Sequence, residues 1–337
     1  AIPDYECCTF RGGIAAFDTA DGRMLWKSHT IAEEPKPTGT KNSTGAATWA
    51  PAGAPIWGSP TIDEKRNLIY AGTGQAYTSP AATTSDSIIA FNLDTGEIEW
   101  VWQATQADAW NMSCFIGRAD NCPEEDGPDF DFGAPPILLS LSTGQDVLLA
   151  GQKSGYVYAL NPDKEGMLIW KKRIGLGGFS GGVHWGMAAD SDSLYVPNAD
   201  TNYINKWQGE RKPGLYALDA ANGDQIWFTP TPTACSEEDK PACDPGLSAA
   251  ISAIPGAIFG GAFDGHLRAY DSQTGAILWD FNTAQKFETV SGDIAKGGSI
   301  ESDGPVVANG HVLINSGYLY GGRMGGNVLL AFTVDGK

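Results

Sequence analysis

The chain has 337 residues, with 22 basic and 40 acidic side chains, a net charge of −18 and 43 glycines. This length exceeds the roughly 250–300 residues at which a single core stops growing, which predicts two domains or a modular fold. The negative charge excludes nucleic acid and anionic membranes as favourable partners. No run of 18 apolar residues occurs, so we expect no membrane-spanning helix.

One pattern recurs along the chain: an apolar strand, an Asp or Asn, a turn that ends in glycine, and a strand that ends in tryptophan. Its copies span residues 14–26, 89–100, 158–170, 216–227 and 269–279. Each copy predicts a hairpin, because glycine supplies the positive φ of the turn. The final tryptophans lie 74, 70, 57 and 52 residues apart. A period near 50 with insertions is typical of a β-propeller.

A further apolar strand precedes four of these hairpins, at residues 67–72, 146–151, 193–197 and 257–261. Such a blade cannot bury both faces alone, so blades stack in a ring. We therefore predict an all-β propeller with tryptophan-docking motifs, of five full blades plus partial blades.

Both ends of the chain interrupt the repeat. Residues 9–17 open inside a hairpin strand, and residues 327–332 repeat the first hairpin strand without a tryptophan partner. We expect residues 1–337 to be one propeller domain that lacks its N-terminal blades. A missing portion, or another chain, would then complete the ring.

The six cysteines suggest three local pairs. Fifteen pairings are possible, but short disulfides would staple the acidic, proline-containing loops in which four of them lie. Free or metal-bound thiols are the alternative, disfavoured because no CxxC motif and no His at zinc spacing occurs. Disulfides would indicate a periplasmic or extracellular bacterial protein. The expected pairs are Cys7–Cys8, Cys114–Cys122 and Cys235–Cys243.

Several catalytic motifs are absent from the sequence, among them GxGxxG, the Walker loop, HExxH and the CxxCH haem site. Residues 178–182 do match GxSxG, with Ser180 at the nucleophile position. That motif requires a strand–turn–helix context, whereas its surroundings here predict strands. We interpret the segment as a glycine-rich turn.

The docked repeat resembles that of the quinoprotein alcohol dehydrogenases. Residues 133–136, 181–186 and 321–327 resemble in particular their polyvinyl-alcohol dehydrogenase branch. The resemblance spans essentially the whole chain and implies an eight-bladed ring with pyrroloquinoline quinone (PQQ) on its axis beside calcium. It also implies an oxidoreductase that converts a secondary or polymeric alcohol to a carbonyl. Electrons would pass to a c-type cytochrome, because the chain has no haem motif.

The resemblance assigns several cofactor contacts. Trp57 falls where the family stacks an indole on the quinone, although a structural blade tryptophan is the alternative. Lys153 falls where a cation faces the quinone oxygens; the alternative is a solvated turn lysine. His184 replaces an Asn before Trp185, in a segment near the cofactor. His184 could be a donor to the quinone or a hydrogen-bonded core histidine.

The metal and base positions depart from the family pattern. Gln75 stands where relatives have a metal-binding Asn. Asn111 stands where many relatives have the Asp that acts as general base, and an amide cannot take that proton. Asp108, three residues earlier, is therefore the predicted base, with a turn cap as the alternative. Asn111 would donate to the quinone or bind the metal.

The N-terminal segment carries the remaining candidates. Cys7 falls where the family's dehydrogenases keep a Glu metal ligand, with Glu6 one residue away. A Cys7–Cys8 disulfide would lie over the cofactor, as neighbouring cysteines do in related enzymes. Arg11 would pair with cofactor carboxylates.

Two other functions stay open at this point. The changes at Cys7, Gln75 and Asn111 also fit a propeller that lost its chemistry and serves as an interaction or assembly module. The tryptophan-rich surface suggests, more weakly, a module that binds carbohydrate or polymer. Its tryptophans are Trp49, Trp102 and Trp207.

Overall fold

The computed structural model describes residues 5–115, 119–201, 209–232, 234–236 and 242–334. These residues form strands and three short 3₁₀ helices, and no α-helix occurs among them. The helices are η1 (Met112–Cys114), η2 (Pro162–Lys164) and η3 (Tyr320–Gly322). No helix in this part of the chain is long and apolar enough to cross a membrane. Trp207, one of the predicted surface tryptophans, lies outside the described residues.

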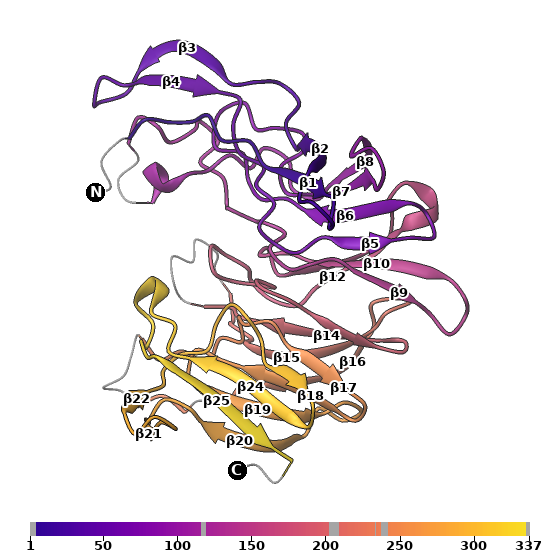
Figure 1. Ribbon diagram of the computed structural model, residues 1–337, viewed down its shortest axis with the longest axis vertical. Coiled ribbons are helices and arrows are strands. Elements are labelled where there is room, and N and C mark those ends of the chain that lie inside the picture. Colours follow the sequence, from indigo (N-terminus) through magenta and orange to yellow (C-terminus); the bar gives the residue numbers. More distant parts are fainter. Residues whose placement is uncertain (1–4, 116–118, 202–208, 233, 237–241, 335–337) are drawn as a thin grey trace. The chain divides into compact units, whose positions relative to one another are not determined.

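Four sheets each contain four strands arranged in chain order, which is the meander expected of a propeller blade (Figure 1). The first is β5 (Thr61–Asp63), β6 (Leu68–Gly72), β7 (Ser87–Asn92) and β8 (Ile98–Gln103). The second is β9 (Ile137–Ser140), β10 (Asp146–Gly151), β11 (Tyr156–Asn161) and β12 (Met167–Arg173). The third is β13 (Ala188–Asp190), β14 (Ser193–Asn198), β15 (Gly214–Asp219) and β16 (Gln225–Pro230). The fourth is β17 (Ser252–Ile254), β18 (Ala257–Gly261), β19 (His266–Asp271) and β20 (Ile277–Asn282).

The remaining sheets are smaller. Two-stranded sheets pair β1 (Gly13–Phe17) with β2 (Met24–His29), β3 (Lys36–Lys41) with β4 (Ala47–Ala50), and β21 (Lys286–Glu288) with β22 (Ile294–Lys296). A three-stranded sheet contains β23 (Val306–Ala308), β24 (His311–Ser316) and β25 (Val328–Thr333).

Four of the five predicted hairpins therefore lie in complete blades, and the first, β1–β2, does not. The segment before β1 forms isolated bridges instead, from Cys7 to Thr48 and from Arg11 to Gly53. The count of five full blades is thus corrected to four within the described residues.

The chain divides into two compact units. The first comprises residues 1–138 with 160–167, and the second comprises residues 139–159 with 168–337. Each has its own core of buried strand residues. In the first unit, Ile69, Ile89 and Phe91 form a cluster against which Trp26 packs. In the second, Leu215, Ile258 and Tyr270 belong to a larger cluster.

The hairpin tryptophans dock on the turn glycine of the following hairpin, which is why the two residue types recur together. Trp26, Trp100, Trp170 and Trp227 lie against Gly96, Gly166, Gly223 and Gly275, respectively. Three of the indoles also donate Nε1–H to the carbonyl three residues before that glycine: Trp26 to Leu93 at 3.2 Å, Trp170 to Ala220 at 3.0 Å and Trp227 to Ser272 at 3.1 Å. A side chain on the glycine would occupy the space of the ring, so each blade fixes its neighbour.

Candidate functional site

A pocket of about 430 Å³ lies in the first unit, where three chain segments meet: residues 5–10, residues 75–77 and residues 110–112. Backbone hydrogen bonds hold these segments together. Ala76 donates to Asp108 O at 3.0 Å, and Trp110 donates to Ala76 O at 2.8 Å. Tyr77 donates to Ala52 O at 2.8 Å. This volume is within the range of about 300–1,000 Å³ that is typical of small-molecule sites.

The Cys7–Cys8 disulfide forms part of the pocket wall. Both cysteines are buried, and they pack on Ala52 and the ring of Tyr77. The main chain of this pair is tied to strand β4, because Trp49 donates to Cys7 O at 3.2 Å and Cys8 donates to Trp49 O at 3.4 Å. The other two predicted disulfides, Cys114–Cys122 and Cys235–Cys243, are also present.

Gln75 brings a polar side chain into this pocket. It is 7% exposed, and its side-chain amide makes no hydrogen bond with the described residues. Its main chain is fixed from both sides, by N–H donation to Asp131 Oδ1 at 2.9 Å and by acceptance from Ala54 N at 2.8 Å. The amide therefore offers its hydrogen-bonding capacity to a molecule in the pocket.

Glu6 also lines the pocket but is exposed, and its carboxylate forms no ion pair within the described part of the chain. Its exposure suits a side chain that contacts a ligand at the mouth of the pocket. The role of Glu6 as a metal ligand stays a prediction.

Asn111 lines the pocket, but its side-chain amide is hydrogen-bonded to other parts of the protein. Nδ2 donates to Tyr77 O at 3.0 Å and to Asn121 O at 2.7 Å, and Oδ1 accepts from Ser113 N at 2.9 Å. The last bond is an N-cap of η1. Asn111 thus joins two loops beside the pocket, and only the second lone pair of Oδ1 is left to contact a ligand.

Asp108 is fully buried and does not line the pocket. Its Oδ1 accepts from Asp129 N at 3.2 Å and its Oδ2 accepts from Phe130 N at 2.8 Å. A carboxylate held by two backbone amides shapes the loop that carries it. The geometry agrees with the turn-capping alternative and lends no support to Asp108 as a base that contacts substrate.

Trp57 and Arg11 do not line this pocket either. The indole of Trp57 lies against the backbone of Gly133, where an added Cβ would come within 2.5 Å of Cζ3. Arg11 donates Nη1–H to Ile31 O at 3.1 Å and to Ala32 O at 3.0 Å. Both side chains therefore have structural contacts, and their cofactor roles stay predictions. Trp110 does line the pocket; the sequence pattern contained it but gave it no role.

In the second unit, the turn after β10 pairs with a glycine-rich loop. Gly178 donates to Lys153 O at 3.0 Å, and Val183 donates to Gln152 O at 3.1 Å. Lys153 is 4% exposed, and its ammonium lies 5.2 Å from the centre of the Phe179 ring, a cation–π distance. This buried position does not agree with a solvated turn lysine.

Ser180 belongs to the same loop. Gly177, Gly178 and Gly182 have φ of +78°, +140° and +59°, and no helix follows. This is the glycine-rich turn that the sequence predicted.

His184 and Trp185 share a buried network with two residues that sequence reasoning missed, Ser248 and Glu301. His184 Nδ1 lies 2.9 Å from Ser248 Oγ and 3.4 Å from Glu301 Oε1. Ser248 Oγ donates to Glu301 Oε1 at 3.2 Å, and Trp185 Nε1 donates to the same oxygen at 3.4 Å. Ser248 and Glu301 lie 64 and 117 residues beyond His184, so no local motif could have indicated them.

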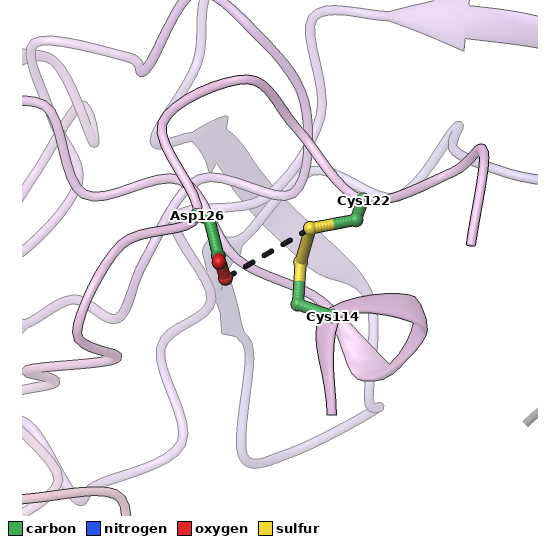
Figure 2. Close-up of side chains that lie close together, drawn as sticks. All are labelled: Cys114, Cys122 and Asp126. Atoms are coloured by element: carbon green, nitrogen blue, oxygen red, sulfur yellow. Dashed lines mark hydrogen bonds between the residues drawn. A yellow bond between two sulfur atoms is a disulfide. The ribbon is translucent and has the colours of Figure 1, made fainter. Parts of the chain in front are cut away.

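Among the described residues, one group of three side chains has metal-ligating atoms close together: Cys114, Cys122 and Asp126. Figure 2 shows that the two cysteines are joined as a disulfide, with Cys122 Sγ 3.9 Å from Asp126 Oδ1. Disulfide sulfurs are not thiolates, so this group is not a metal centre. The pocket itself offers oxygen donors of Glu6, Gln75 and Asn111, fewer than the six to eight ligands that calcium takes.

Known proteins resemble this chain along its whole length. Residues 4–115 match the family model described as glucose/ethanol/alcohol dehydrogenase, β-propeller domain, and residues 153–286 match the model described as outer membrane protein assembly factor BamB. Polyvinylalcohol dehydrogenases from a Pseudomonas species and from Sphingopyxis sp. strain 113P3 are each 43% identical to the chain, over 99% and 100% of its length. The chain is similar to these alcohol dehydrogenases, as its sequence predicted.

The chain spans about half the length of these quinoprotein relatives, 52% and 53%. Solved structures share its fold. The quinohemoprotein alcohol dehydrogenase from Comamonas testosteroni aligns with a TM-score of 0.66 at 19% identity, over 98% of this chain and 57% of that one. A europium-containing methanol dehydrogenase aligns with a TM-score of 0.63 at 17% identity, over 96% and 70%. The predicted β-propeller fold is confirmed, and so is the predicted resemblance to these dehydrogenases.

Proposed function

We propose that this chain forms part of a PQQ-dependent dehydrogenase that oxidises a secondary or polymeric alcohol to a carbonyl. One observation carries the proposal. In a chain 43% identical to polyvinylalcohol dehydrogenases, the Cys7–Cys8 disulfide walls a pocket into which the Gln75 amide opens, and this amide makes no hydrogen bond among the described residues. In related enzymes neighbouring cysteines form a disulfide over the cofactor, and we propose that Cys7–Cys8 does the same here, although in a different blade.

The pocket residues fit PQQ as a flat, polar ring system. The disulfide, Tyr77 and Trp110 provide surfaces for its faces, and the Gln75 amide provides a hydrogen bond at its edge. When bound, PQQ accepts the two electrons of the oxidation. The protein's part is to hold it, exclude water and remove the hydroxyl proton of the alcohol.

Calcium is a weaker part of the proposal. Oxygen donors of Glu6, Gln75 and Asn111 could hold a hard cation only if the cofactor supplied further ligands. We therefore attribute no step to the metal. The role that the resemblance gives to Lys153, a cation facing the quinone oxygens, stays a prediction.

The electron acceptor and the compartment complete the proposal. The sequence contains no CxxCH motif, so electrons would pass to a separate c-type cytochrome or to a haem outside this chain. The three disulfides favour export to the periplasm or beyond it. We also propose that residues 1–337 belong to one propeller domain. Further residues or a second molecule would complete its ring.

Cofactor titration tests the proposal. Purified chain is mixed with PQQ, with and without calcium, and binding is followed by quinone absorbance and by quenching of tryptophan fluorescence. Dye reduction by secondary alcohols and by polyvinyl alcohol is then measured. We expect saturable binding that Gln75→Ala weakens at least about tenfold and that Gln225→Ala, an exposed strand position, leaves unchanged. Absence of binding, or equal effects of the two substitutions, would rule the proposal out.

A second function has one observation in its favour. Residues 153–286 match the model of an outer-membrane assembly factor, which agrees with a propeller that binds other proteins and has no redox chemistry. Carbohydrate or polymer binding has less support as a function. The backbone of Trp49 is hydrogen-bonded to Cys7, and the ring centre of Trp102 lies 6.4 Å from that of Phe132. Failure to bind PQQ, together with stable folding, would favour this second class.

A further inference from the structure

The equivalent hairpin strands β1, β7, β11, β15, β19 and β25 each carry an alanine near their middle, which marks matching positions from sheet to sheet. These alanines are Ala16, Ala90, Ala159, Ala217, Ala269 and Ala331. Successive side chains of a strand point to opposite faces of the sheet. The residue two places before the alanine therefore lies on one face, which we call the forward face. The residue directly after the alanine lies on the other, the rear face.

The forward face of one sheet packs on the rear face of the next, and the same two positions meet each time. Each of the three contacts that show this lies within one compact unit. The pairs share a buried apolar cluster: Leu215 with Tyr270, Leu267 with Phe332, and Ile14 with the cluster that contains Phe91. The contact between a forward residue and a rear residue is therefore a repeated element of this fold, and it specifies which side chain covers which.

The β23–β25 sheet exposes its forward face. Leu329, the forward residue of β25, is 65% exposed. The forward residues of the four complete sheets are all fully buried: Ile88, Val157, Leu215 and Leu267. The neighbours of Leu329 on this face are apolar too, because the exposed Ala331 pairs with Leu313, which in turn pairs with the exposed Val306. A single exposed leucine is ordinary, but here the position is buried wherever a complete sheet carries it.

The β1–β2 sheet exposes its rear face in the same way. Phe17, the rear residue of β1, is 58% exposed, and its partner in β2, Met24, is exposed as well. The rear residues of the four complete sheets are fully buried: Phe91, Leu160, Leu218 and Tyr270. The chain therefore carries, on two different sheets, the two halves of its own repeated contact.

We propose that a second copy of this chain docks head-to-tail, with the rear face of its β1–β2 sheet on the forward face of the β23–β25 sheet. Leu329 of one copy then contacts Phe17 of the second copy, as Leu267 contacts the cluster of Phe332 within one chain. The contact is heterologous, because the two copies contribute different surfaces. The proposal names the second molecule of the proposed function and rests on it only for the idea that a ring is completed.

Sedimentation velocity of the 337-residue chain over a range of concentrations tests the association. Burial of apolar side chains drives it, and the net charge of −18 on each copy opposes it. Salt screens this repulsion, so we expect association to strengthen between about 50 mM and about 500 mM salt. Leu329→Glu and Phe17→Glu should each raise the protein concentration needed for association at least about tenfold. Ile226→Glu, at an exposed apolar position of the complete sheet that contains β16, is the matched control and should change nothing.

Mixing the two variants tests the head-to-tail geometry. Leu329→Glu keeps an intact β1–β2 face, and Phe17→Glu keeps an intact β23–β25 face. Neither variant should associate alone, whereas an equimolar mixture should form a 1:1 dimer that grows no further, because one productive contact is left. A symmetric contact between like faces would give no such recovery. Circular dichroism of each variant checks that the substitution leaves the fold intact.

Three results would overturn the proposal. They are a wild-type chain that stays monomeric at every concentration and salt level, association that both substitutions leave unchanged, and a mixture of the variants that does not dimerise. A monomeric chain would assign the two faces to another polypeptide. PQQ titration keeps the proposed function separate, because neither Phe17 nor Leu329 lines the pocket that contains Gln75. Association without PQQ binding would overturn the proposed function alone.

Discussion

Gln75 donates its backbone N–H to Oδ1 of Asp131 at 2.9 Å, and Asp131 is itself buried. The carboxylate lies 56 residues further along the chain, so it fixes from a distance the position at which the Gln75 amide enters the pocket. Gly74 is part of the same contact, because an added Cβ there would lie 2.6 Å from Asp131 Oδ1. The pocket therefore depends on a group that does not line it.

Removal of this carboxylate should affect both stability and binding. Asp131→Ala leaves the buried Gln75 N–H without its acceptor, which costs about 1–3 kcal/mol of unfolding free energy. We expect PQQ affinity to fall as well, because the amide is no longer held. Asp131→Asn keeps an acceptor oxygen and should lose less stability and less PQQ affinity. Urea unfolding and quinone titration measure the two effects; equal losses in both variants would contradict the argument.

The docked tryptophans predict a difference between two turn glycines. Gly275 has φ of +72° and would place a Cβ 2.5 Å from Trp227 Cε3, whereas Gly256 has φ of +86° and no atom within 4 Å. Gly256→Ala should lower the unfolding free energy by about 1–2 kcal/mol, which is the cost of placing alanine in the left-handed conformation. Gly275→Ala should cost about 1–3 kcal/mol more through overpacking. Urea midpoints compare the two, and equal destabilisation would show that the indole does not depend on the glycine.

Two disulfides of the same loop length should differ in their effect on binding. Each joins cysteines eight residues apart, so removal of either should lower stability by about 2–3 kcal/mol. The Cys114–Cys122 loop also contains Asn121, whose carbonyl accepts from Asn111 beside the pocket at 2.7 Å. The double alanine variant of this pair should therefore weaken PQQ binding. The same change at Cys235 and Cys243 serves as the control, and equal weakening would contradict the link to the pocket.

The parts of this protein that the sequence predicted correctly are those in which the cause is local. A hairpin turn and its tryptophan are encoded within a dozen residues, and close cysteines need no long-range information. Asp108 shows the limit. The resemblance made Asp108 the predicted base, and that role stays a prediction; the sequence could not show that amides of Asp129 and Phe130, about 20 residues later, donate to its carboxylate. Side-chain direction depends on such distant partners, and the His184 network escaped prediction for the same reason.

The pH dependence of stability should include a contribution from Asp63. Burial alone would raise the pKa of this carboxyl, but hydrogen bonds from Arg66 and Tyr70, both 2.8 Å from Oδ2, hold the pKa below its ordinary value. A lowered pKa means stabilisation that is present above the unfolded pKa of about 3.9 and is lost as pH falls through the folded pKa.

Asp63→Asn should therefore make the decline of unfolding free energy below about pH 4 shallower, by up to one proton. Urea unfolding from about pH 7 to about pH 3 measures the slope. Asp303→Asn, at an exposed position, is the control and should keep the wild-type slope. A steeper decline in Asp63→Asn would reverse the sign of the argument.

Asn111 gives the sharpest test of how this chain departs from its relatives. The resemblance assigns a general base to position 111, which favours an aspartate there, but Asn111 Nδ2 donates to Tyr77 O and Asn121 O. Asn111→Asp removes both donors and sets a carboxylate beside two carbonyl oxygens, so we expect a loss of about 2–4 kcal/mol of stability and no gain in kcat. Asn111→Ala removes the same two donors and also the Oδ1 acceptor of Ser113 N–H, but it adds no charge and should lose less. A stable, faster Asn111→Asp enzyme would show that the two carbonyls find other partners and that the base position is still functional.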